Sequence, residues 1–147
     1  MPVKHVKIAG GIEKKLSAAL RAAPYRLRVG FMKSDRYPRG ISIATVAAIN
    51  DFGAPSRGIP PRPFFRNMVR DKSPQWPNTL ADLLKANGYD AKAALDKMGL
   101  IIADQLRDSI LHGAWTPNAP STVKRKGSDQ PLIDTRRMID NITHEVI

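Results

Sequence analysis

Residues 91–112 read AKAALDKMGLIIADQLRDSILH, and this stretch decides the fold. Its apolar residues recur at helical spacing and form one stripe, which predicts an amphipathic helix. Asp90 is placed to cap the start of this helix, and Gly113 follows its end. Gly99 weakens a helix by roughly 1 kcal/mol relative to alanine, which indicates a close packing contact at that position. The stripe consists of Ala91, Ala94, Leu95, Met98, Ile102, Leu106 and Ile110.

Alternating apolar residues predict strands that pack against this helix. The segment 25–31 alternates strictly, so we expect one face of its strand to be buried and the other to be basic. Weaker patterns predict strands at Val3–Ile8 and Ile142–Ile147. The expected buried face consists of Tyr25, Leu27, Val29 and Phe31, and the opposite face of Arg26, Arg28 and Gly30.

Several shorter segments have helical spacing, and proline, glycine or a capping residue marks their ends. Ser42 is expected to cap a helix through Phe52 that Gly53 closes in the left-handed conformation. The Pro-rich segment Ala54–Pro63 is expected to be extended, with Pro63 starting a short helix. The other short helices are predicted at Gly11–Ala23, Asn78–Asn87 and Thr135–Asp140, the last capped by Asp134.

These patterns together predict an α+β fold, with a small antiparallel sheet packed against one long helix, several short helices and long loops at 33–40 and 113–131. The length of 147 residues suits one domain, so we expect residues 1–147 to fold as a single unit.

Composition limits the classes of function. The chain has no cysteine, which rules out disulfides and thiolate metal sites. It also lacks a signal-peptide pattern and any apolar run of about 18 residues, so we expect synthesis in the cytoplasm. The net charge of +11 is concentrated in residues 1–40, which hold ten basic and two acidic side chains. Such a basic field attracts polyanions or acidic protein surfaces.

The sequence shows no convergent set of catalytic groups. The histidines are His5, His112 and His144, and we interpret the pair Asp108 and His112 as a contact near a helix end. Asp104 and Asp108 share a helix face, which is more typical of a solvated surface than of a paired acid. We therefore expect no enzyme activity, no cofactor and no metal site.

Clustered cations could contact a polyanion, because phosphate contacts need only positive charge. Tyr37 lies among them and could stack on a base. The alternative is a solvated surface. If these residues bind nucleic acid on their own, the chain would be a small, basic, non-specific nucleic-acid-binding protein acting in packaging or regulation. The residues are Arg26, Arg28, Lys33, Arg36, Arg39, Lys124, Arg125 and Lys126.

Three blocks carry a resemblance to a known family. They read VAAINDFG at 46–53, IPPRPFFR at 59–66 and PNAPSTVKRKGSDQPLIDT at 117–135, followed by Met138 and an apolar C-terminal strand. In this order they resemble the neck and tail-completion (minor tail, virion morphogenesis) proteins of long-tailed double-stranded DNA bacteriophages. The family commonly has glycine after the Asp-Thr pair, where this chain has Arg136 and Arg137. This departure puts the geometry of that turn in doubt.

The resemblance implies a structural virion protein without bond chemistry. It implies a homo-oligomeric ring of six or twelve copies that completes the tail and joins it to the DNA-filled head. The implied partners are further copies of the chain, the connector or head-completion protein, and the tail terminator or tail tube protein, with non-specific contact to packaged DNA. The implied location is the neck or tail of the virion, after synthesis in the bacterial cytoplasm.

Residues of the second and third blocks are candidates for contacts with neighbouring subunits or partners. Aromatic and arginine side chains are favoured in protein–protein interfaces. The intramolecular alternative is that Phe64 and Phe65 fill the core while Arg62 pairs with Asp51 or another carboxylate. Leu132 and its neighbours could likewise form a core plug and a helix cap. The candidate residues are Arg62, Phe64, Phe65, Arg66, Leu132, Asp134 and Thr135.

Overall fold

The computed structural model describes residues 24–32, 36, 40–113 and 136–147, together with five helical positions between Gly11 and Arg21. The strand predicted at Val3–Ile8 and the apolar positions of the helix predicted at Gly11–Ala23 lie outside this part. The elements are β1 (Leu27–Phe31), α2 (Ile43–Phe52), the 3-10 turn η1 (Pro55–Arg57), α3 (Phe64–Lys72), the 3-10 turn η2 (Ser73–Gln75), α4 (Trp76–Ala86), α5 (Ala91–His112), α7 (Arg137–Asp140) and β2 (Ile142–Val146).

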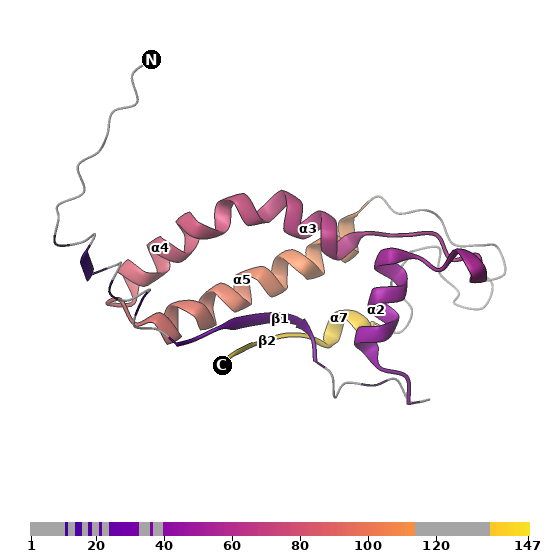
Figure 1. The fold of residues 1–147 in the computed structure, drawn as a ribbon, viewed down its shortest axis with the longest axis horizontal. Coiled ribbons are helices and arrows are strands. Elements are labelled where there is room, and N and C mark those ends of the chain that lie inside the picture. The colour runs from indigo at the N-terminus through magenta and orange to yellow at the C-terminus, as the bar shows by residue number, and fades with distance from the viewer. Residues whose placement is uncertain are drawn as a thin grey trace, which may run out of the picture.

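Helix α5 is the centre of the fold, with α3 and α4 along one side of it and the two-stranded sheet along the other (Figure 1). Its bounds are those predicted, and Asp90 caps it by accepting a hydrogen bond from the Ala93 N–H at 3.1 Å. Most of the predicted stripe is buried. The α+β fold with a long helix packed on an antiparallel sheet is therefore confirmed.

The sheet pairs a strand from the first part of the chain with the strand near its C-terminus. Strand β1 pairs antiparallel with β2, and the register runs from Leu27 opposite Val146 to Phe31 opposite Ile142. Leu27, Val29 and Phe31 pack against the core as predicted. The prediction that Tyr25 is buried is wrong, because this side chain is 42% exposed. The pairing of the two strands ends at Arg26, which exchanges backbone hydrogen bonds with Ile147. Tyr25 lies one residue beyond this pairing, so the sheet does not cover its side chain.

At Gly99, helix α5 passes close to a side chain of the sheet. A Cβ atom at this position would lie 2.3 Å from Cδ2 of His144 on β2. The imidazole is held there because its Nε2 lies 2.8 Å from an Asp96 carboxylate oxygen. The glycine predicted to mark a packing contact therefore gives room for a side chain of β2.

We expect Gly99→Ala to destabilise the protein by about 1 to 3 kcal/mol through overpacking against His144. Helix propensity alone predicts the opposite sign, a gain of roughly 1 kcal/mol. Urea denaturation of the single variants and of Gly99→Ala combined with His144→Ala would separate the two effects. Without the imidazole, the alanine should become neutral or stabilising. An unchanged cost in the double variant would contradict the contact.

Helices α3 and α4 form a nearly continuous layer over α5 (Figure 1). The 3-10 turn η2 joins them directly, so α4 begins at Trp76, two residues before the predicted start at Asn78. Trp76 fixes this layer on α5 by donating its indole N–H to the Gln105 side-chain oxygen at 2.9 Å. Phe64, at the start of α3, is fully buried in the core.

Some helix ends differ from the predicted geometry. Ser42 is at the N-cap of α2 but its side chain makes no capping hydrogen bond. Gly113 ends α5 with φ −70°, which is an extended conformation and not a left-handed one. The segment predicted to be extended contains η1, because Ala54 and Ile59 form an antiparallel bridge around it. Only the part after Ile59 runs without a turn.

Helix α7 starts two residues later than predicted, at Arg137. The residue before it, Arg136, has φ 59° and ψ −4°, which is the left-handed conformation. Glycine adopts this conformation without the Cβ penalty that other residues incur. The structure thus places an arginine in a glycine-type conformation at the position where the resembled family commonly has glycine.

We expect Arg136→Gly to stabilise the protein by about 1 kcal/mol, because it removes the left-handed penalty of a residue with Cβ. Thermal unfolding would measure the gain. Arg136→Ala is the matched control: it removes the same charge and side chain but keeps Cβ, so it should give no gain. Equal stability of the two variants would show that the gain does not come from the backbone conformation.

Candidate functional site

The first two blocks of the resemblance form one structural unit, which we call the Asp51 clasp. It consists of the end of α2 with Asp51, Phe52 and Gly53, and the start of α3 with Phe65 and Arg66. The Asp51 carboxylate is almost fully buried. It accepts hydrogen bonds from the Phe65 N–H at 2.9 Å, from the Arg66 N–H at 3.4 Å and from the Arg66 Nε at 2.7 Å.

Asp51 takes the place of a local cap for α3. The first N–H groups of a helix have no partner within the helix, and Pro63 at the N-cap supplies no side-chain acceptor. A carboxylate from α2 satisfies two of these donors, and its charge is favourable at the positive end of the helix dipole. The clasp therefore orients α3 relative to α2 through charge-assisted hydrogen bonds.

Backbone contacts hold the segment between α2 and α3 at its start, Gly53, and near its end, Arg62. Gly53 has φ 76° and ψ 172°, so its φ is positive as glycine allows, but its ψ is not that of the predicted left-handed closure. The Arg62 N–H donates to the Asn50 carbonyl at 2.8 Å. Arg62 itself is 7% exposed, and burial lowers the pKa of its guanidinium. The hydrogen bond of its N–H and the burial of its side chain thus hold Arg62 against the end of α2, next to the clasp.

The intramolecular alternative applies to part of the second block. Phe64 fills the core, and Phe65 packs half-buried at its edge, where it covers Gly30 of β1. The ion pair seen for Asp51 is with Arg66, at 2.7 Å, whereas the sequence alternative paired Arg62 with Asp51 or another carboxylate. The two arginines of the block thus have different roles: Arg62 is buried, and Arg66 reaches the surface.

The exposed part of the clasp is an aromatic–arginine pair. Phe52 is 65% exposed, and the Arg66 guanidinium carbon lies 4.5 Å from the centre of its ring. Beside this pair is an open hollow of about 320 Å³ between β1, α2 and the start of α3. It is lined mainly by apolar side chains: Val29, Phe31, Ala44, Ala47, Ala48, Phe52, Phe64 and Phe65. Sequence reasoning had not singled out Phe52, whose signal is an aromatic residue next to a helix-ending glycine.

The predicted polyanion-facing residues are only partly described. Arg26 is exposed just before β1. Arg28 lies 3.4 Å from Glu145 on the neighbouring strand, so its charge is partly balanced. Arg36 donates to the Gly40 carbonyl at 2.8 Å. The other residues of this prediction, Lys33, Arg39, Lys124, Arg125 and Lys126, lie outside the described part, as do Tyr37 and the interface candidates Leu132, Asp134 and Thr135.

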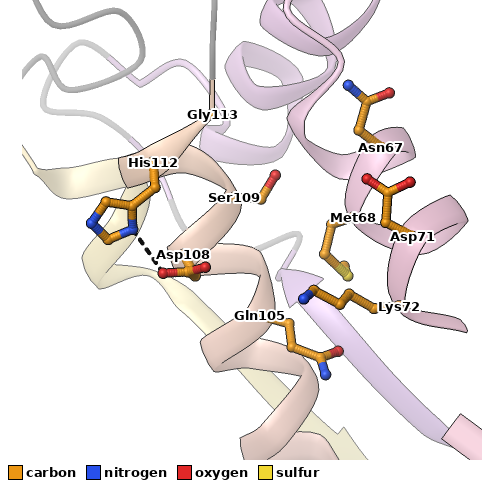
Figure 2. A pocket seen from close by; sticks show the side chains of 9 residues that line it. All are labelled: Asn67, Met68, Asp71, Lys72, Gln105, Asp108, Ser109, His112 and Gly113. Atoms are coloured by element: carbon orange, nitrogen blue, oxygen red, sulfur yellow. Dashed lines mark hydrogen bonds and ion pairs between the residues drawn. The ribbon is translucent and has the colours of Figure 1, made fainter. Parts of the chain in front are cut away.

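A second, polar hollow lies between α3 and the end of α5 (Figure 2). Asp108 and His112 are in contact at 2.7 Å on α5, and Asp104 pairs with Arg107. On α3 the hydrogen bond from Arg70 lowers the pKa of Asp71. The Ser109 hydroxyl donates to the Phe64 carbonyl at 2.7 Å. Its hydrogen bond thus serves the fold, and the side chains around this hollow form no base–nucleophile pair.

In the described part of the chain, no three histidine or acidic side chains gather as metal ligands would. No helix there combines the length and apolar character that a membrane span requires. Comparison with known proteins gave no matching family model, no similar curated protein and no similar solved structure. Among the described residues, the Asp51 clasp with its apolar hollow combines a buried charge network with exposed apolar side chains.

Proposed function

We propose that the chain is a structural protein of a tailed-phage neck. It would form a homo-oligomeric ring that completes the tail and joins it to the DNA-filled head. The observation that carries the proposal is the Asp51 clasp. Two of the three blocks behind the family resemblance, at 46–53 and 59–66, meet there around one buried carboxylate. A resemblance built from blocks that form one unit is more informative than the same residues scattered over the surface.

The chemistry of the clasp suits a binding role. Exposed aromatic and arginine side chains beside an apolar hollow are typical of the centre of protein–protein interfaces. Rigid presentation of these groups lowers the entropy lost on association. The partners in this proposal are further copies of the chain, the connector or head-completion protein, and the tail terminator or tube protein. The basic side chains near β1, including Arg26, would face packaged DNA.

The test is electron microscopy of a lysate from a phage that carries a nonsense codon early in this gene. The proposal expects filled heads and separate tails, and joined particles when the wild-type protein is supplied from a plasmid. Normal joined particles without the protein would remove the joining role and favour the nucleic-acid-binding alternative. Empty heads would move the defect to DNA packaging and would likewise count against the proposal.

A further inference from the structure

The outer side of α2 is an apolar surface that no described element covers. The helix carries one charged residue, Asp51, which points into the clasp. Its outward residues follow helical spacing, and all of them are exposed: Ile41 just before the helix, then Thr45, Ala48 and Phe52. A contiguous patch of exposed apolar side chains is typical of an interaction site. This surface continues into the apolar hollow beside Phe52, so together they form one patch, the α2 face.

The charge at the edge of the α2 face is positive. Arg66 uses its Nε and Nη2 on Asp51, while its Nη1 has no partner among the described residues. Its side chain is 49% exposed. The carboxylate among the residues that line the hollow is Asp51, which is buried and already bound. The α2 face therefore suits a partner surface that combines apolar side chains with carboxylates.

The chain itself has such a surface on α5, on the side turned away from the core. Leu100, Asp104, Asp108 and Leu111 follow one another at intervals of four, four and three residues, so they lie along one side of the helix. All four are exposed, which leaves two leucines 53% and 40% exposed. Between them are two carboxylate side chains that are 77% and 67% exposed. Each also contacts a side chain of its own helix, Asp104 with Arg107 at 2.8 Å and Asp108 with His112 at 2.7 Å, and its remaining exposed surface faces solvent. We call this surface the α5 face.

We propose that the α2 face of one copy docks on the α5 face of a second copy. Leucines of the α5 face would enter the apolar hollow, Asp104 would meet the outer edge of Arg66, and Asp108 would lie opposite Ala48. The two faces are different parts of the chain, so the contact is head-to-tail, and such contacts close into rings when the rotation allows. This inference rests on the proposed ring function and names the surfaces that would form it.

The test is analytical ultracentrifugation of the full chain over a range of concentrations. Ala48→Asp puts a carboxylate on the α2 face, opposite the acids of the α5 face. Like charges brought together at an interface are strongly unfavourable, so we expect dissociation to be favoured roughly tenfold or more. Thr45→Asp on the same face is the second variant, and circular dichroism would establish that both are folded.

Charge reversal makes the test specific. Ala48→Asp combined with Asp108→Lys should restore association, because the two new charges attract each other. The matched control combines Ala48→Asp with Asp82→Lys, which gives the same net charge but changes exposed α4 instead. Association should stay weak in this control. Equal rescue by both lysines would overturn the proposal, as would undiminished association of both aspartate variants or a wild-type chain that remains monomeric.

The failure of this inference can be told from failure of the neck function. A wild-type oligomer that both aspartate variants leave intact would reject the α2–α5 contact, whatever the nonsense phage shows. A phage that makes normal joined particles without this protein would reject the joining role, even if the oligomer behaves as expected.

Discussion

Asp51→Ala should destabilise the protein by about 3 kcal/mol, because a buried carboxylate with several charge-assisted hydrogen bonds is lost. The substitution leaves the Phe65 and Arg66 N–H groups at the start of α3 without their acceptor. Loss of a helix cap alone costs about 1 kcal/mol. The ion pair with Arg66 adds to this, although that side chain is half-exposed, so water compensates part of its loss. Urea denaturation would measure the change.

Two further variants make the Asp51 prediction specific. Asp51→Asn keeps one carbonyl oxygen for the Phe65 N–H but removes the charge, so its cost should lie between those of wild type and alanine. Asp82→Ala removes an exposed carboxylate on α4 that has no described partner, and it should change stability by less than about 0.5 kcal/mol. Equal costs for Asp51→Ala and Asp82→Ala would mean that the clasp does not hold α3.

The long helix could be predicted from sequence to its terminal residues, because the apolar stripe and the flanking residues Asp90 and Gly113 agree on its extent. The apolar stripe of α5 fixed its extent, and Asp90 makes the predicted capping bond. Gly99 was correctly interpreted as the site of a close packing contact, because glycine in the middle of a helix lowers its stability and needs another reason to be there. The partner of that contact, His144, lies on β2 and could not be identified from local pattern.

The roles of the site residues were harder to predict, because tertiary contacts determine them. Asp51 caps α3, which begins only after an intervening turn. Capping is predicted from the residues directly before a helix, so a distant carboxylate is missed. The helix α2 was predicted from its caps and apolar residues, but whether another element covers its outer side depends on the whole fold. Tyr25 had the right alternation for burial and is exposed because it lies beyond the end of the strand pairing.

Arg136 shows what the resemblance adds to the physical analysis. Sequence patterns alone placed a helix cap at Asp134 and gave no reason to expect a positive φ at Arg136. The departure from the resembled family at this position left the geometry of the turn open. The left-handed conformation of Arg136 means that a residue with a Cβ atom occupies a conformation that glycine adopts at lower cost. The expected gain from Arg136→Gly therefore tests the conformation of this turn.

Gly53→Ala should lower the free energy of unfolding by about 3 to 5 kcal/mol. Two costs combine at this position. The conformation with φ 76° and ψ 172° is one that essentially only glycine adopts. A Cβ atom would also lie 2.7 Å from the Pro61 nitrogen and 2.9 Å from the Ile59 carbonyl oxygen, and these backbone atoms cannot rotate away.

Gly58→Ala separates the two costs at Gly53. Gly58 also has a positive φ, 66°, but a Cβ atom there would meet nothing within 4 Å. Its substitution should therefore cost only about 1 kcal/mol, the conformational part alone. Thermal and urea unfolding of both variants would show the difference. If Gly53→Ala cost no more than Gly58→Ala, the chain would not pass as close to the end of α2 as the clasp requires. The α2 face would then not be held rigidly beside Arg66.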